Sequence, residues 1–174
     1  MTKTIAAVRA DFKKRLAKKP IIVAPGVFDA LSARIGEQAG FEALFLSGSA
    51  MSYSQLGRPD IGLVTMPELA DAVARISDRV SIPVLADVDS AFGAAPHAAR
   101  LMRQFEKAGA AAVQIEDQMV VKPGDALLSR PLVSVEEMTG KIKAMVDARD
   151  HADTLLSARS DAKDSNEAID RCAA

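Results

Sequence analysis

Two carboxylates directly follow one of the short apolar runs of the chain. Asp87 and Asp89 flank Val88, after the run at residues 82–86. Residues i and i+2 of a strand face the same side, so these carboxylates would repel each other unless a cation lay between them. Ligands that are all oxygen suit Mg2+ or Mn2+ rather than zinc. We therefore predict a divalent metal site at Asp87 and Asp89.

Charged residues also follow two later apolar runs. Glu116 comes after residues 111–115 and is expected to partner the aspartates at the metal. Arg159 comes after residues 155–158, and its planar guanidinium suits a carboxylate or a phosphate. The same guanidinium could instead pair with Asp161, two residues further on.

Ser47, Gly48 and Ser49 end the apolar run at residues 43–46. Glycine lets a backbone approach a ligand closely, and the hydroxyl and N–H groups could hold a carboxylate or an enolate oxygen. An ordinary turn is the alternative, because Ser and Gly are common in turns. His97 and His151 lie away from the ends of the apolar runs and are expected to be structural or solvated, and Cys172 is the only cysteine. A disulfide within the chain and a cysteine zinc site are therefore excluded.

The elements that would position these residues alternate between strand and helix. Strands are predicted at residues 21–24, 43–46, 82–86, 111–115 and 155–158, and helices at 27–39, 66–80, 95–107, 134–148 and from the cap Ser165 onward. Thr65 with Glu68, and Ser134 with Glu137, have the spacing of capping boxes. Fully apolar strands are typical of parallel sheets, which leaves an open doubly wound sheet or part of a (β/α)8 barrel. No G-x-G-x-x-G or P-loop motif follows a strand.

In a barrel, the carboxyl ends of the strands converge on the face where active sites form. The polar residues at the run ends are then expected to form one site, although each of them could instead cap a strand or a helix. Net charge is −1 and pI about 6.1, which gives no basic footprint for nucleic acid. Residues 1–19 are charged throughout and no apolar run approaches about 18 residues, so neither a signal peptide nor a membrane span is expected. A single cytoplasmic domain over residues 1–174 is predicted.

Ordered motifs extend over nearly the whole chain: residues 25–33, 45–49, 57–62, 86–93, 108–118 and 158–162. Together they resemble the isocitrate lyase/phosphoenolpyruvate mutase superfamily. The resemblance implies an α/β fold of the (β/α)8 TIM-barrel type, of which about the first five β/α units are present. It also implies a carbon–carbon lyase or decarboxylase that acts on small 2-oxo or 2-hydroxy carboxylic acids through an enolate stabilised by Mg2+ or Mn2+.

Roles follow from the resemblance position by position. The residues that would bind substrate are Phe45, Ser47, Gly48, Ser49, Asp87 and Arg159. The metal would be bound directly by Asp87, and as near ligands or through water by Asp60, Asp89 and Glu116. The catalytic residues would be Arg159 and Lys122. Only Asp60, Phe45 and Lys122 depend on the resemblance alone.

Two departures from the family pattern bear on the reaction. Gly124 and Ala126 stand where lyases of the family carry the Cys and His of a loop after the Glu-Asp motif, and Gln118 stands where the phosphonomutase branch has Lys. We therefore favour a decarboxylase or an atypical carbon–carbon lyase. The alternatives are a phosphonomutase or phosphonopyruvate hydrolase, favoured by the retained Lys122, and a truncated chain without catalysis.

Five β/α units fill about 170 residues, whereas a complete barrel takes about 250. The chain is therefore expected to be a fragment of a longer enzyme or a truncated product, with unpaired strand edges that lower its stability or promote association. The full-length form is expected to be a homo-oligomer.

Overall fold

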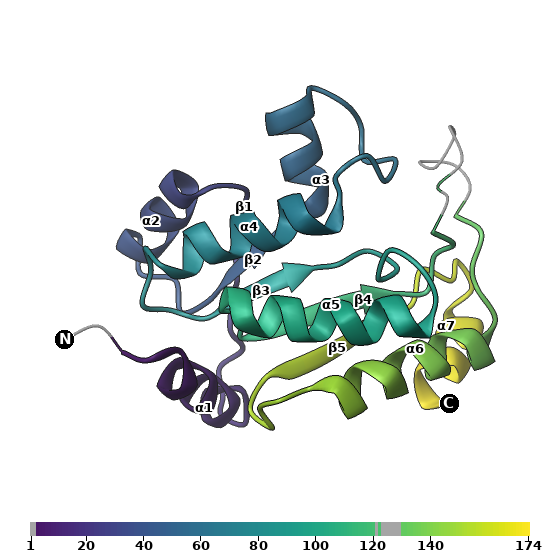
Figure 1. Cartoon of the computed structure of the whole chain (residues 1–174). Helices are drawn as coiled ribbons and strands as arrows, with labels where there is room; N and C mark the ends of the chain where they lie inside the picture. Colours follow the sequence, from purple (N-terminus) through teal and green to yellow (C-terminus); the bar gives the residue numbers. More distant parts are fainter. Residues whose placement is uncertain (1–2, 121, 123–129) are drawn as a thin grey trace.

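A parallel sheet forms the centre of the molecule (Figure 1). The computed structural model describes residues 3–120, 122 and 130–174. Among these residues the strands pair in chain order, each parallel to the next: β1 (Gly26–Val27), β2 (Leu44–Leu46), β3 (Val84–Asp87), β4 (Ala112–Glu116) and β5 (Leu155–Arg159). Consecutive parallel strands joined through helices are the arrangement of a (β/α) barrel, so the predicted α/β fold is confirmed.

The described helices are α1 (Ile5–Leu16), α2 (Ala30–Gln38), α3 (Gly48–Met51), the π-helix η1 (Ser52–Leu56), α4 (Met66–Ser77), α5 (Ala95–Ala108), α6 (Val135–Ala148) and α7 (Ser165–Ala173). Helices α4, α5 and α6 lie over one face of the sheet (Figure 1). None of the described helices is long and apolar enough to cross a membrane.

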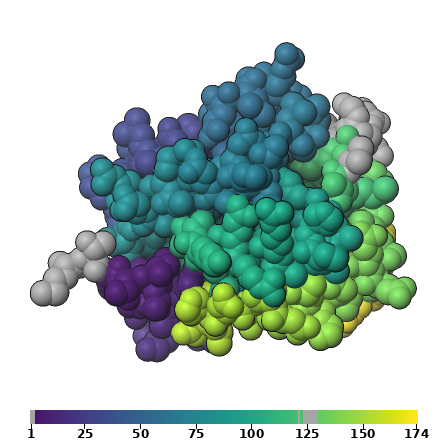
Figure 2. All heavy atoms as spheres, viewed as in Figure 1, coloured from purple at the N-terminus to yellow at the C-terminus, as the bar shows by residue number. Residues whose placement is uncertain are grey.

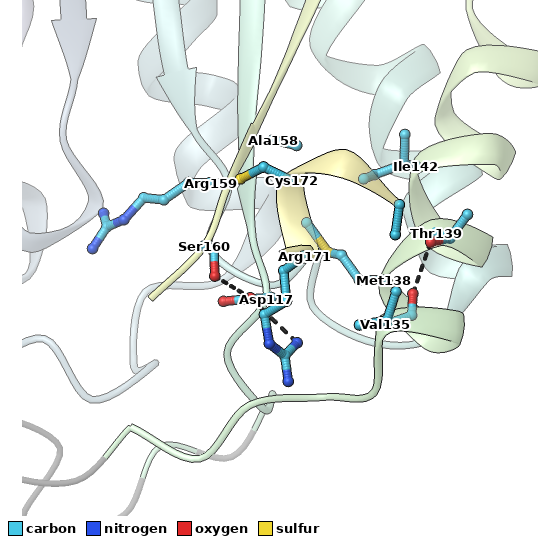
Figure 3. A pocket seen from close by; sticks show the side chains of 11 residues that line it. Asp117, Val135, Met138, Thr139, Ile142, Ala158, Arg159, Ser160, Arg171 and Cys172 are labelled. Carbon is cyan, nitrogen blue, oxygen red and sulfur yellow. Dashed lines mark hydrogen bonds and ion pairs between the residues drawn. The ribbon is translucent and has the colours of Figure 1, made fainter. Parts of the chain in front are cut away.

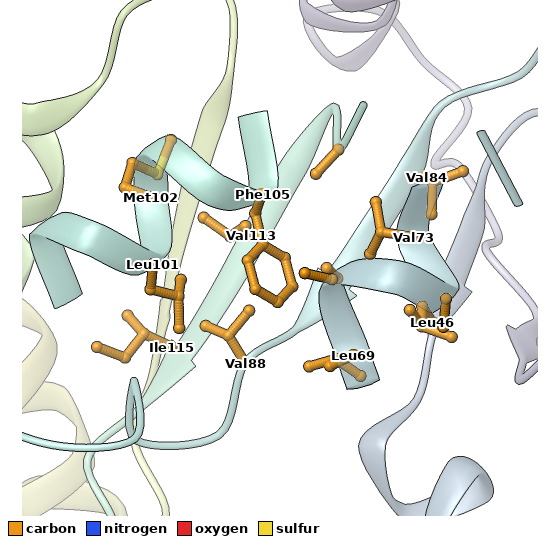
Figure 4. Close-up of a cluster of buried hydrophobic side chains, with 14 of the residues drawn as sticks. Leu46, Leu69, Val73, Val84, Val88, Leu101, Met102, Phe105, Val113 and Ile115 are labelled. Carbon is orange, nitrogen blue, oxygen red and sulfur yellow. The ribbon is translucent and has the colours of Figure 1, made fainter. Parts of the chain in front are cut away.

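The main core lies between the strands and helices α4 and α5 (Figure 4). Leu69 and Val73 of α4 and Phe105 of α5 pack against Val84 and Val113 of the sheet, and all five side chains are buried. Burial of a large apolar side chain contributes about 1.5–3 kcal/mol. This core therefore fixes the strands whose ends carry the polar residues singled out above.

The predicted first strand is wrong in position. Pairing begins at Gly26, opposite Phe45, rather than within residues 21–24. Ile21 is 83% exposed and Val23 60% exposed, whereas Ile22 and Ala24 pack on a second apolar cluster. The run was read as a strand because it is apolar, but backbone pairing depends on the register that β2 imposes.

Helix α1 closes the amino-terminal end of the sheet, where the sequence predicts only a charged segment. Its Phe12 packs on Ala43 and Ala112 near the starts of β2 and β4. The buried Arg9 donates from Nε to the carbonyl of Ala110 (2.9 Å) and from Nη2 to that of Glu106 (2.7 Å). In the space-filling view α1 lies against the chain just before β5 (Figure 2).

Of the three helix caps predicted from the sequence, those of α4 and α6 are confirmed and that of α7 is wrong. The Thr65 N–H donates to the Glu68 carboxylate (2.7 Å), and the Glu137 N–H donates to Ser134 Oγ (3.1 Å). Ser165 is not the cap of α7, since Asp164 Oδ1 accepts from the N–H groups of Asn166 and Glu167, both at 3.0 Å. A carboxylate one residue earlier can satisfy both N–H groups at once.

Candidate active site

Alternation along the strands separates the core from the polar residues. Leu46, Ala86 and Ile115 point into the helix-covered core, so Asp87 and Glu116, one residue further along, lie on the opposite face. These two acids are also the last residues of β3 and β4. Arg159 ends β5 and is the register partner of Glu116. The carboxyl ends of three neighbouring strands therefore bring two acids and a guanidinium to one edge of the sheet.

The segment after β2 begins a helix rather than a simple turn. Ser47 caps α3, and its Oγ accepts from the N–H of Ala50 at 3.2 Å. Gly48 is buried, and a Cβ built on it would lie 3.7 Å from Oδ2 of both Asp87 and Asp89. The backbone at Gly48 thus faces both carboxylates directly. Phe45, two residues before Ser47, is half-buried on the same face of β2.

The loop after β3 holds Asp89 in an unusual backbone conformation. Asp89, Ala91 and Phe92 all have positive φ (47°, 66° and 57°), which is uncommon for residues other than glycine. The Asp89 carbonyl accepts from the N–H of Glu116 at 2.9 Å. Strand β4 therefore fixes the loop that carries the second carboxylate.

Burial makes two of the acids weak. Burial, and then the charge of Asp89, raises the pKa of Asp87 to about 6. Burial, and then the charges of Asp87 and Asp89, raises the pKa of Glu116 to about 7. Oε1 of Glu116 is buried without a hydrogen-bond partner among the described residues. A group with unmet acceptor capacity and a raised pKa favours a nearby cation or a proton.

Lys122 lies among these acids. Its Nζ is 2.5 Å from Asp89 Oδ1, 3.0 Å from Asp60 Oδ1 and 3.9 Å from Glu116 Oε1. Burial lowers the pKa of this ammonium, but the charges and hydrogen bonds of Asp89 and Asp60 outweigh burial, so the pKa is raised. Lys122 is therefore charged at neutral pH and neutralises part of the acid cluster.

Arg159 pairs with two acids. Its Nη1 lies 3.4 Å from Glu116 Oε2, and its Nε donates to Asp161 Oδ1 at 2.7 Å. Burial lowers the pKa of Arg159, but Glu116 and Asp161 raise it further, so the guanidinium stays charged. The two readings of Arg159 from the sequence are thus compatible, since it pairs with Asp161 and also borders the acid cluster.

The acid cluster has a donor set that suits Mg2+. Within the part of the chain that the structure describes, no three His, Cys, Asp or Glu side chains are arranged closely enough to enclose a metal ion. The side chains of Asp87, Asp89 and Glu116 offer only oxygen atoms, and one buried oxygen of Glu116 has no hydrogen-bond partner among the described residues, so the set fits a cation held partly through water. That Asp87 binds the metal directly and that Asp60 takes part stay predictions from the sequence.

A separate cavity of about 150 Å³ lies between α6, β5 and α7 (Figure 3). Met138 and Ile142 line it, and the Arg159 side chain points away from them, toward the other face of β5 (Figure 3). None of the acids Asp60, Asp87, Asp89 and Glu116 lines this cavity. Of the site residues predicted from the sequence, Arg159 alone also lines this cavity.

Most of the site residues predicted from the sequence lie close together. Ser47, Gly48, Asp87, Asp89 and Glu116 meet at one edge of the sheet, together with Asp60, Lys122 and Arg159. Gly124 and Ala126, at the family's Cys and His positions, lie outside the described residues.

The contacts that surround Asp161 were not predicted from the sequence. Gln118 Nε2 and Arg130 Nη1 both donate to Asp161 Oδ2, the latter at 2.9 Å. The buried Asp117 accepts from the Asp161 N–H at 2.8 Å. Only the i, i+2 spacing of Arg159 and Asp161 gave a signal of this arrangement.

Comparison with known proteins agrees with this geometry. The family model described as phosphoenolpyruvate phosphomutase matches residues 12–174. The chain is 41% identical over 165 residues to 2,3-dimethylmalate lyase of Eubacterium barkeri, covering 93% of this chain and 57% of that protein. It is 45% identical over 151 residues to 2-methylisocitrate lyase of Aeropyrum pernix, covering 87% and 48%. The chain thus spans about half the length of the curated relatives it matches.

Solved structures show the same similarity. Phosphoenolpyruvate phosphomutase from Streptomyces platensis subsp. rosaceus superposes with a TM-score of 0.89 at 34% identity, over 94% of this chain and 58% of that one. A phosphonopyruvate hydrolase in complex with oxalate and Mg2+ superposes with a TM-score of 0.85 at 31% identity, over 98% and 59%. The five β/α units therefore correspond to part of a TIM-barrel-type fold.

Proposed function

The chain belongs to the isocitrate lyase/phosphoenolpyruvate mutase superfamily, and from this premise we propose that it is a Mg2+-dependent carbon–carbon lyase or decarboxylase. Its substrates would be small 2-oxo or 2-hydroxy carboxylic acids. The observation that carries the proposal is the convergence of Asp87, Asp89 and Glu116 with Arg159 at the carboxyl ends of β3, β4 and β5. A cytoplasmic location and a homo-oligomeric full-length form belong to the same proposal.

The proposed substrate-binding residues have complementary donors. Because Ser47 Oγ already accepts from the Ala50 N–H, its own proton is free to be donated to a substrate oxygen. The absence of a side chain at Gly48 leaves the space in front of Asp87 and Asp89 open. Arg159 would receive a carboxylate at the opposite side of the acid cluster, through a charge-assisted hydrogen bond.

Charge stabilisation would provide most of the catalysis. When bound, Mg2+ would supply Lewis acidity toward the 2-oxo and carboxylate oxygens of the substrate. Lys122 remains an ammonium at neutral pH because its pKa is raised, so it would stabilise negative charge instead of acting as a base. Loss of CO2 leaves an enolate that water can protonate, which requires no side-chain acid at position 124.

Chemistry on a phosphonate is the second candidate. The observation that favours it is the position of Lys122, whose Nζ lies 3.0 Å from Asp60 at the rim of the cluster, where a cation could contact a phosphoryl group. Two of the similar solved structures are named phosphonopyruvate hydrolase. Against it stands Gln118, whose amide is bound to Asp161.

Thermal melts with Mg2+ and oxalate, a planar dianion that mimics the pyruvate enolate, test whether the site binds such ligands. At 100 times its dissociation constant, oxalate should add about 2.7 kcal/mol of stability. We expect a rise in melting temperature that requires both additives and is lost in Asp87→Ala. Asp71→Ala, which removes an exposed carboxylate from α4, is the matched control.

Turnover then separates the two candidate reactions. Release of pyruvate from oxaloacetate, without release of phosphate from phosphonopyruvate, would support the lyase or decarboxylase. Release of inorganic phosphate alone would replace it with the phosphonate reaction. A chain that shows neither the melting shift nor turnover would contradict both.

A further inference from the structure

The Asp161 side chain receives donors on both of its oxygens. Oδ1 accepts from Arg159 Nε at 2.7 Å, and Arg159 Nη2 lies 2.7 Å from the same oxygen. Oδ2 accepts from Arg130 Nη1 at 2.9 Å and from Gln118 Nε2. The side chain is only 7% exposed. A carboxylate with this many donors cannot turn without breaking several charge-assisted hydrogen bonds.

The backbone of Asp161 is fixed as well. Its N–H donates to Asp117 Oδ1 at 2.8 Å. Ser160 Oγ donates to Asp117 Oδ2 at 2.7 Å (Figure 3). Asp117 follows Glu116 directly at the end of β4 and is 2% exposed. The turn after β5 is therefore attached to β4, the strand that carries the buried acid of the cluster.

This arrangement determines which edge of Arg159 is available. Asp161 occupies Nε and Nη2, so Nη1 is left on the side of Glu116, 3.4 Å from its Oε2. Arg159 is 38% exposed, and a long side chain with that exposure would otherwise sample several rotamers. Because Asp161 holds the Nε and Nη2 edge of the guanidinium, Nη1 is oriented toward the acid cluster.

We propose that Asp161 is a positioning residue, which holds the Arg159 guanidinium so that its Nη1 edge receives the substrate carboxylate. This inference depends on the proposed function only for the identity of the ligand. Gln118 and Arg130 support the carboxylate from its far side, so that Asp161 does not follow Arg159 when the guanidinium moves. Asp161 acts through Arg159 and needs no contact with the ligand itself.

A double-mutant cycle with oxalate tests the inference by calorimetry in the presence of Mg2+. We expect Asp161→Ala to raise the dissociation constant of oxalate about ten-fold, and Asp161→Asn to raise it less. In an Arg159→Gln background the same changes should have less than a two-fold effect, because residues that act through one group are not additive. Additive effects in the two backgrounds would overturn the proposal.

The side-chain NMR signal of Arg159 Nε–H gives a readout that does not depend on ligand binding. The signal is identified by its loss in Arg159→Gln, and its exchange with water should be at least ten-fold faster in Asp161→Ala than in the native chain. Exchange that stays within two-fold would overturn the proposal. If the native chain binds no oxalate, the proposed function fails, and this measurement still decides the role of Asp161.

Two further variants separate positioning from general stability. Glu42→Gln breaks the bidentate pair with Arg15 at the other end of the sheet and should change neither oxalate affinity nor the Arg159 signal. If Asp161→Ala does not give a cooperative melt, Asp161→Asn, which has nearly the same shape, serves for both measurements. An equal effect of Glu42→Gln and Asp161→Asn would overturn the proposal.

Discussion

The Nζ atom of Lys122 lies 3.9 Å from Oε1 of Glu116, a buried oxygen that accepts no hydrogen bond from the described residues. The ammonium is nearer to Asp89 and Asp60, at 2.5 and 3.0 Å. Glu116 is thus close enough to Lys122 for attraction but too far for a hydrogen bond. Burial and the charges of Asp87 and Asp89 outweigh the attraction of Lys122, so the pKa of Glu116 is raised.

Replacing Glu116 should alter how stability depends on pH. Because the folded-state pKa of about 7 exceeds the ordinary value of 4.5, the folded protein binds more protons than the unfolded chain between these pH values. The stabilising contribution is complete below pH 4.5 and is lost as the pH rises through 7. Relative to the native chain, Glu116→Gln should gain about 2 kcal/mol between pH 5 and pH 8.

Urea denaturation at the two pH values without metal measures this gain. Asp87, with a pKa of about 6, contributes a slope of the same sign and remains in both proteins. Glu42→Gln, at the opposite end of the sheet, is the control for removal of a glutamate. A stability difference between Glu116→Gln and the native chain that is the same at pH 5 and pH 8 would contradict the prediction.

Removal of the Lys122 ammonium should make the protein depend on a divalent cation. Lys122→Met leaves Asp89 and Asp60 without the ammonium that pairs with them, which should cost about 2 kcal/mol in a chelator. Added Mg2+ should restore most of this loss, so the rise in melting temperature on adding Mg2+ should be larger for the variant than for the native chain. Lys143→Met, which breaks an exposed pair with Asp147, should behave like the native chain.

A methyl group at Gly48 should block the site while leaving the fold intact. Its Cβ would lie 3.7 Å from both aspartate oxygens, which is ordinary contact and requires no movement of the chain. We expect Gly48→Ala to melt within about 1 kcal/mol of the native chain, since alanine favours helix. Binding of oxalate with Mg2+ should nevertheless fall at least ten-fold.

The matched control for Gly48 is Gly140 in α6. A Cβ there meets nothing within 4 Å. Gly140→Ala should therefore stabilise the protein by about 0.5–1 kcal/mol without any change in ligand affinity. Equal affinities for oxalate in the two alanine variants would show that Gly48 does not face the ligand.

The observed cap of α7 gives a prediction that separates two adjacent residues. Asp164→Ala removes the acceptor of two backbone N–H groups and should destabilise the start of α7 by about 1 kcal/mol. Ser165 lies inside the helix, so Ser165→Ala should have little effect on the stability of α7. Native-state hydrogen exchange of the α7 amides distinguishes the two, and equal loss of protection in both variants would contradict this assignment.

Most strands, and the strand ends at which the acids lie, could be predicted from the sequence. Apolar runs before Asp87, Glu116 and Arg159 predicted three strands, and each strand ends at the charged residue itself. A change from apolar to charged is a strong local signal, because a parallel strand is buried on both faces until it reaches the edge of the sheet. The same signal failed at residues 21–24, which are apolar but precede the paired residue Gly26.

Individual contacts between distant segments could not be predicted from periodicity. The family resemblance placed Lys122 and Asp60 in one site, but no periodicity relates two residues that are sixty-two positions apart. Asp161 was recognised only as a neighbour of Arg159, because the donors from Gln118 and Arg130 depend on the way the chain returns after β4. Helix α1 was missed because the sequence was judged there by its charge, although Phe12 and Arg9 face inward.

The inner face of the sheet changes in character from one end of the strands to the other. Near the amino-terminal ends Phe12 closes an apolar cluster with Ala43 and Ala112, and at the carboxyl ends the same face carries Asp87 and Glu116. The apolar cluster has a low permittivity and the solvent beyond the carboxyl ends has a high one, so the electric field of these acids is directed toward the solvent. The carboxyl ends of β3 and β4 are therefore the part of this face at which an approaching cation would meet the strongest attraction.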